Sequence, residues 1–280
     1  MFAQLSGALA RAVLVALLLA MPSLMLPTVA LDTTQIVIVL SLIAGVMVFF
    51  EYNGSCPSML EFRFAPPYNR LKFGFIAVAV LVLSMVFRGY SDPGSWSVLF
   101  ANLGAAIGRA LDFPYSPVRL VLTLMPLDAD PHSIEIVRMS TGVCYALSLV
   151  MLFTFVAVVR LMGWPVRRGA FNVWINLPLF DPTGGGDVVR RLNRDSSVNI
   201  TLGFLLPFLL PLGAMFVSDY FDFQAVLNPQ TLIWMTCVWA FVPASMIMRG
   251  VAMNRIAELI TAKRRRAYAK ARTEDGMQTA

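Results

Sequence analysis

The stretch MSTGVCYALSLVMLFTFVAVV, Met139 to Val159, decides the fold class of this chain, because it contains no Asp, Glu, His, Lys or Arg. A helix that crosses the hydrocarbon core of a bilayer, about 30 Å thick, needs about 20 consecutive apolar residues at about 1.5 Å per residue. The stretch has that length and composition. It therefore predicts a transmembrane helix, and with it an integral membrane protein.

The rest of the chain repeats this pattern. The 280 residues are 58% hydrophobic and 14% charged, whereas about a quarter of the residues of a soluble domain are charged. We predict one all-α, polytopic membrane domain over residues 1–280, with about six transmembrane helices. The further uncharged runs are Ala12–Val29, Gln35–Phe50, Phe73–Phe87, Val198–Val217 and Gln230–Met248.

The first run has a second interpretation, as a cleaved signal peptide. Arg11 would form the basic region, Ala12–Leu19 the apolar region, and Thr28–Ala30 the small-residue cleavage site. The apolar stretch continues through Leu24–Leu26, which makes it long for a signal peptide. We expect an uncleaved first helix, and leave open whether residues 1–30 are ever removed.

The basic residues predict the orientation in the membrane. Six helices place both termini on one side, and that side carries 18 of the 22 Lys and Arg residues. Basic residues concentrate in cytoplasmic loops, so we predict cytoplasmic N and C termini. The short connections and the charge bias favour the bacterial inner membrane. Because topology explains the net charge of +6, the charge does not indicate a nucleic-acid partner.

The long outer loop contains a predicted amphipathic helix over residues 95–112. Gly104 and Gly108 form a GxxxG pair at the edge of its apolar face, a pattern that allows close helix packing. Counting it as a seventh span would place the later Arg-rich loops outside, so we predict an interfacial or re-entrant helix. The candidate helix-docking residues are Trp96, Phe100, Gly104 and Gly108.

The glycine-rich stretch PLFDPTGGGDVVRRLNRDSS, Pro178 to Ser197, raises the question of a phosphate-binding loop. A P-loop requires a Lys followed by Ser or Thr after its last glycine, and this stretch has no lysine, while Asp187 would repel an anion. We interpret the stretch as a polar hinge, with Asp187 capping a surface helix that leads into the fifth span. On that helix Arg190, Arg191 and Arg194 face lipid phosphates or water.

A second basic cluster follows the last span in the predicted cytoplasmic tail, residues 249–280. Anionic lipids attract such clusters, but the same residues also serve as a plain topology anchor, and the sequence leaves both readings open. Anionic lipid is thus a predicted partner at the cytoplasmic face. The candidate lipid or anion contacts are Arg190, Arg191, Arg194, Lys263, Arg264, Arg265 and Arg266.

Two cytoplasmic segments, Leu60–Ala65 and Phe171–Leu177, alternate apolar and polar residues as short strands do. They either pair into a ribbon or lie singly at the membrane interface, with Trp164 and Trp174 at head-group level.

The sequence predicts no catalytic residue, cofactor site or metal site. His132 is the only histidine, which excludes a bis-His haem, and its spacing to Asp128 and Asp130 is not diagnostic of a metal. Cys56 has no histidine nearby to activate it, and the three cysteines predict no disulfide.

These features favour a non-catalytic accessory, scaffold or assembly subunit that binds another integral membrane protein or forms homo-oligomers. The alternative is a facilitator of a small neutral or lipidic solute, and a membrane enzyme acting on lipid ranks third. A facilitator requires polar groups that converge near the membrane midplane. The residues available for that purpose are Asn199, Thr201, Thr236 and Ser245.

Overall fold

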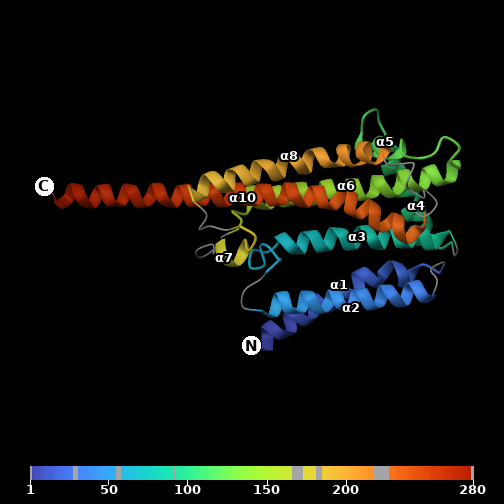
Figure 1. The fold of residues 1–280 in the computed structure, drawn as a ribbon, viewed down its shortest axis with the longest axis horizontal. Helices are drawn as coiled ribbons and strands as arrows, with labels where there is room; N and C mark the ends of the chain where they lie inside the picture. The colour runs from blue at the N-terminus through green and yellow to red at the C-terminus, as the bar shows by residue number, and fades with distance from the viewer. Residues whose placement is uncertain are drawn as a thin grey trace.

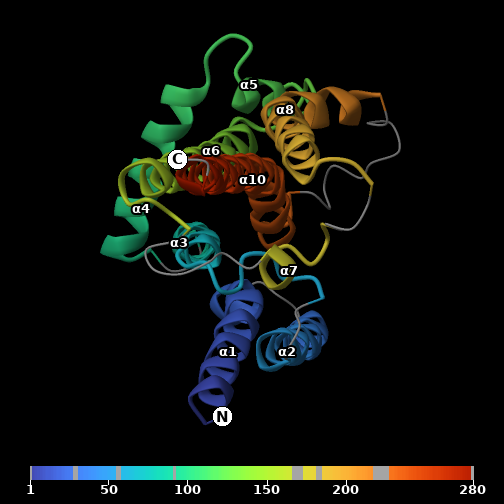
Figure 2. The same ribbon diagram turned by 90° about the vertical axis from the view of Figure 1, so that its left-hand side faces the viewer.

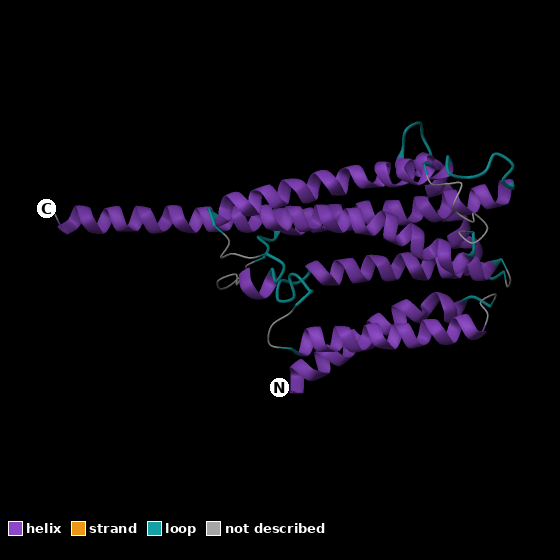
Figure 3. Ribbon diagram, viewed as in Figure 1, coloured by secondary structure: helices purple, strands orange, loops and turns teal. Residues whose placement is uncertain are grey.

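The computed structural model describes residues 2–27, 31–54, 58–90, 93–165, 173–180, 185–216 and 227–278. This part of the chain consists of helices and turns and contains no β-strand (Figure 3). The helices are α1 (Phe2–Met25), α2 (Leu31–Asn53), α3 (Tyr68–Gly89), α4 (Ser95–Leu111), α5 (Pro117–Leu122), α6 (Pro131–Leu161), α7 (Val173–Asn176), α8 (Val188–Met215) and α10 (Pro229–Gln278).

Six of these helices, namely α1, α2, α3, α6, α8 and α10, are long and apolar enough to cross a membrane. The prediction of an all-α polytopic membrane protein is therefore confirmed. Both termini lie at the same end of the bundle, which we call the basic end (Figure 1). The other end, where α4 and α5 lie, is called the far end.

Several helices run well beyond the predicted spans. α10 is a single helix of 50 residues, about 75 Å long, so the predicted span 230–248 and the predicted tail as far as Gln278 are continuous. α8 also runs unbroken from Val188, so no separate surface helix precedes the fifth span. Gly186, with φ +95°, makes the turn just before α8. Residues 188–197 of the predicted hinge thus belong to the continuous helix α8, and the hinge itself stays a prediction for the residues before it.

The helices form two groups (Figure 2). α10 is central and packs against α8, α6 and α3, while α1 and α2 form a hairpin that joins the rest mainly through α1 and α3. At the far end of the hairpin, the Gln230 side chain of α10 donates a hydrogen bond of 2.8 Å to Ser23 of α1. The hairpin is therefore held to the bundle along one side.

Small residues allow α8 and α10 to approach closely. A methyl group added at Gly203 would lie 2.6 Å from the Pro243 carbonyl oxygen, and one at Gly250 would lie 2.7 Å from the Ser196 carbonyl oxygen. The Ser196 hydroxyl donates a 2.7 Å hydrogen bond to the Gly250 carbonyl oxygen. Membrane helices associate by this kind of close packing and interhelical hydrogen bonding, because lipid supplies no hydrophobic driving force between them.

A proline in α8 leaves a carbonyl group that α10 satisfies. Pro211 has no N–H, so the Pro207 carbonyl, one turn earlier, loses its helical donor. The Trp239 indole N–H of α10 donates to this carbonyl oxygen at 3.2 Å. A neighbouring helix thus restores the hydrogen bond that proline removes inside the apolar region.

α4 lies across the far end of the bundle instead of running along it (Figures 1 and 2). Its glycine face meets α6: a methyl group at Gly108 would lie 2.8 Å from the Arg138 carbonyl oxygen, and one at Gly142 would lie 2.6 Å from the Gly108 Cα. Trp96, on the other face, is 67% exposed and stacks on Phe100. This crosswise orientation agrees better with an interfacial helix than with a re-entrant one.

We expect Trp239→Phe to lower the free energy of unfolding by about 1 kcal/mol, since it removes an interhelical hydrogen bond in the apolar region. Restoring the backbone donor with Pro211→Ala should shrink the effect of Trp239→Phe, because the Pro207 carbonyl then regains its own helical partner. Thermal unfolding of the four proteins of this double-mutant cycle in one detergent measures the coupling. Additive effects would contradict the assignment.

We expect Gly108→Leu to destabilise the fold by roughly 2–3 kcal/mol, because the added side chain meets backbone atoms of α6 that cannot yield. Gly74→Ala in α3 is the matched control, since nothing lies within 4 Å of a methyl group there. That control should be neutral or slightly stabilising. Equal melting temperatures for Gly108→Leu and the wild type would show that α4 does not depend on this contact.

Candidate functional site at the basic end of the bundle

An ion pair fastens the loop between α2 and α3 to α10. Glu61 receives two hydrogen bonds from Arg249, from Nε to Oε2 at 2.7 Å and from Nη2 to Oε1 at 2.9 Å. The side chains are 10% and 24% exposed. Bidentate pairs of this kind are among the stronger charge-assisted interactions. Neither residue was singled out for this role from the sequence, because a loop residue and a helix residue 188 positions apart carry no local signal of pairing.

An aromatic cluster lies beside this ion pair. Phe62, Tyr68, Phe155 and Trp164 form it, with neighbouring ring centroids 4.4–6.3 Å apart. The Trp164 indole N–H donates to the Ala65 carbonyl oxygen at 3.1 Å. Trp164 is only 3% exposed. Its ring fills the space between the α2–α3 loop and α6, so it does not face lipid, and its depth at head-group level stays a prediction.

The two predicted extended segments are also not strands. Residues 61–64 form turns, and α7 occupies Val173–Asn176, while Phe171 and Asn172 lie outside the described residues. The segments nevertheless meet: the Phe62 and Phe64 amides donate to the Asn176 backbone and side-chain oxygens at 2.7 and 3.0 Å. The left-handed conformation of Phe62, φ 54°, bends the chain and prevents an extended segment.

The end of α2 is capped by the same loop. The Arg63 guanidinium donates to the carbonyl oxygens of Glu51 and Gly54 at 2.6 and 2.8 Å, and also to that of Tyr52. A helix end leaves such carbonyls without helical partners, and a basic side chain there satisfies them. The Glu51 carboxylate in turn accepts the Ser58 amide at 3.1 Å. This mutual capping explains why polar residues stand where the alternating pattern suggested a strand.

A half-open groove of about 320 Å³ runs between α3 and α10. Lys72 and Arg249 line it at the basic end, and apolar side chains line it toward the far end. Lys72 lies just outside the predicted span 73–87, but in the structure it belongs to α3 and faces this groove. The groove therefore combines a cationic end with an apolar wall.

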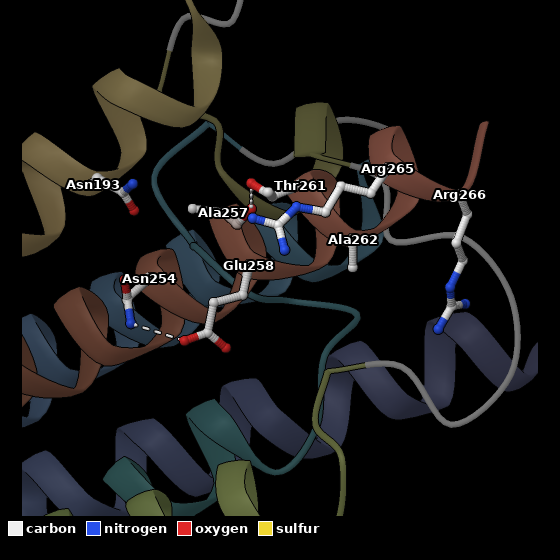
Figure 4. Close-up of a pocket in the computed structure, with 8 residues that line it drawn as sticks. All are labelled: Asn193, Asn254, Ala257, Glu258, Thr261, Ala262, Arg265 and Arg266. Atoms are coloured by element: carbon white, nitrogen blue, oxygen red, sulfur yellow. Dashed lines mark hydrogen bonds between the residues drawn. The ribbon is translucent and has the colours of Figure 1, made fainter. Parts of the chain in front are cut away.

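A second, wider cleft of about 550 Å³ opens between the start of α8 and α10 (Figure 4). Asn193 reaches it from α8, and Asn254, Glu258, Thr261, Arg265 and Arg266 reach it from α10. The Asn254 amide donates to Glu258 at 3.3 Å, and Arg255 pairs with the same carboxylate at 3.0 Å. The negative charge of Glu258 in this cleft is thus already compensated by Asn254 and Arg255 of the same helix.

The candidate anion contacts occupy different surroundings. Arg190 and Arg194 are exposed at the start of α8, as predicted, but Arg191 is half-buried with its guanidinium 5.1 Å from the centroid of the Phe180 ring. Arg264 bonds Asp187 at 2.7 Å, which ties α10 to the residue before α8. This hydrogen bond holds the pKa of Asp187 below its usual value. The pairing is therefore present at neutral pH and is lost as the pH falls through that lowered pKa.

The polar residues proposed for a solute pathway do not converge. Asn199 and Thr236 each donate to a carbonyl oxygen of their own helix at 2.7 Å. Thr201 is exposed on α8, and Ser245 lines the groove beside α3. No hydrogen bond joins these four described side chains.

The far end carries its own charge network, which the sequence search did not identify. Asp112, at the end of α4, binds Arg138 of α6 at 2.9 Å and Arg119 of α5 at 2.6 Å, and its side chain is 7% exposed. Asp130 caps α6 as predicted, accepting the Ser133 amide at 3.3 Å. His132 packs edge-on against Tyr90. The pair of Asp112 and Arg138 joins the crosswise helix α4 to α6.

The chain matches no family model, and neither the curated proteins nor the solved structures contain a significant match to it.

We expect Glu61→Gln to lower the free energy of unfolding by about 3 kcal/mol, because it leaves Arg249 without its carboxylate in a mostly buried position. Glu61→Gln combined with Arg249→Gln should recover part of this loss, since no unpaired charge remains. Glu258→Gln, at an exposed pair, is the control and should change stability by less than about 1 kcal/mol. The measurement is thermal unfolding in detergent, and similar losses for Glu61→Gln and Glu258→Gln would contradict the structural role.

Proposed function

We propose that this chain is a non-catalytic subunit of a membrane complex, which binds another integral membrane protein as an accessory, scaffold or assembly component. The observation that supports this proposal is the projecting end of α10 (Figure 1). Every side chain from Ala262 to Arg272 is exposed. The basic residues on this segment are Lys263, Arg264, Arg265, Arg266, Lys270 and Arg272.

The reach of this segment favours a protein partner over lipid. Lys263 is fourteen residues beyond Arg249, which corresponds to about 21 Å along the helix. Attraction to a charged lipid surface falls off within a Debye length, about 8 Å at physiological ionic strength. A helix that continues along the bundle axis therefore carries this charge beyond lipid head groups. An acidic surface of a partner, on the predicted cytoplasmic side, provides the complementary charge.

A second contact surface lies within the membrane on α2. This helix packs mainly against α1, and its exposed surface from Ile36 to Phe50 is apolar, with Ile36, Val39, Leu40, Ile43 and Phe50 all more than half exposed. A neighbouring transmembrane helix packs against such a surface without uncovering any polar group. The facilitator alternative has less support, because the four polar side chains that it requires do not converge, and Asn199 and Thr236 bond carbonyl oxygens of their own helices.

The proposal is tested by purifying the full chain from its native membrane in a mild detergent and quantifying copurifying proteins by mass spectrometry. We expect one integral membrane protein in fixed ratio to the chain. Replacing Lys263, Arg264, Arg265 and Arg266 with Gln should reduce its recovery at least about tenfold, corresponding to about 1.4 kcal/mol of binding free energy.

The control carries four Gln substitutions nearer the bilayer, at Arg70, Arg160, Arg190 and Arg194, all of which are exposed. It should retain the partner, because it removes the same charge but leaves the projecting segment intact. Recovery of the chain alone, or equal losses in both variants, would overturn the proposal.

A further inference from the structure

The cationic end of the α3–α10 groove carries one uncompensated positive charge. Lys72 and Arg249 line it, and Glu61, which binds Arg249, supplies the neighbouring carboxylate. The Lys72 ammonium lies 4.4 Å from the centroid of the Tyr68 ring and has no hydrogen bond or ion pair with the described residues. The guanidinium of Arg249 has five N–H donors, and Glu61 takes two of them.

A second polar group beside Lys72 also has no partner. Tyr68 is 1% exposed, and its hydroxyl forms no hydrogen bond with the described residues. A half-buried ammonium at the boundary of a membrane span costs free energy unless an anion or water compensates it. The site is therefore suited to a ligand that brings one negative charge to Lys72.

The remainder of the groove is apolar and extends along the helices from the basic end into the predicted membrane-spanning region. Its walls include Ile76 of α3 and Trp234, Val238, Phe241 and Met246 of α10. From Arg249 to Trp234 the groove follows about 22 Å of helix. Half of the hydrocarbon core is about 15 Å thick, so the groove covers about one and a half times the depth of one leaflet.

We infer that this groove binds one anionic phospholipid from the leaflet at the basic end. The phosphate lies between Lys72 and Arg249, and an acyl chain lies along Val238 and Phe241 toward Trp234. A zwitterionic lipid fits less well, because its cationic group would face the same basic residues. Free phosphate would leave the apolar wall uncovered. The cleft of Figure 4 does not offer this combination, because six of the eight residues that line it are polar and Arg255 already compensates Glu258.

Trp234 provides a direct test, because bromine atoms on an acyl chain quench the fluorescence of a tryptophan that they touch. The full chain is reconstituted in phosphatidylcholine bilayers that contain increasing amounts of dibrominated phosphatidylglycerol or dibrominated phosphatidylcholine. The difference between the wild type and Trp234→Phe isolates the signal of Trp234. We expect half-quenching at about fivefold lower content of the brominated anionic lipid, the ratio expected for one additional charge contact.

Two substitutions on α3 separate the site from general surface charge. Lys72→Gln should reduce the fivefold preference to near unity. Arg70→Gln, which removes an exposed charge that does not line the groove, should preserve it. Lys72→Arg should also preserve it, which keeps the test informative if Lys72→Gln does not fold.

The outcomes are distinct. Equal quenching of wild-type Trp234 by the two brominated lipids would overturn the inference, as would a preference that survives Lys72→Gln. Loss of the preference on adding 10 mM inorganic phosphate would show an anion site that does not require a lipid. Because these measurements need no protein partner, their result is independent of the proposed function.

Discussion

The structure depends on the requirement that every backbone N–H and C=O within the hydrocarbon core finds a partner inside the protein. Six long helices meet this requirement through their own hydrogen bonds. Where Pro211 removes a donor in α8, the Trp239 indole of α10 replaces it at the Pro207 carbonyl. Pro211 is thus compatible with a membrane span because the neighbouring helix is close enough to complete the pairing.

The close approach of the helices also depends on glycine residues at their contacts, because glycine has no side chain to hold the helices apart. Gly203 and Gly250 join α8 to α10, and Gly108 and Gly142 join α4 to α6. Charged groups gather at the two ends, where they are paired across elements: Glu61 with Arg249 at the basic end, and Asp112 with Arg138 at the far end. The centre is therefore held by close packing, and the ends are held by ion pairs that fix the loops and the crosswise helix.

The basic end combines two kinds of positive charge that differ in their distance from the bilayer. Lys72 and Arg249 lie at the mouth of an apolar groove, which is the proposed lipid site. The cluster Lys263–Arg266 lies about 21 Å further along α10, a separation greater than the Debye length of about 8 Å. One helix thus contributes to a proposed site for lipid and carries a proposed site for a partner. The two are separated by distance and by the chemistry around them.

The sequence by itself determined the membrane environment, the six helices and the cap at Asp130, because length, apolarity and capping are local properties of the chain. It also located the GxxxG pair of α4, although not its partner Gly142. The prediction of extended segments at residues 60–65 and 173–177 was wrong, because an alternating pattern does not reveal the caps and turns that Arg63 and Asn176 impose. Only the tertiary structure decided that Glu61 binds Arg249 and that Lys72 faces a groove. Those contacts join residues far apart in the chain, and the packing of helices, not local propensity, brings them together.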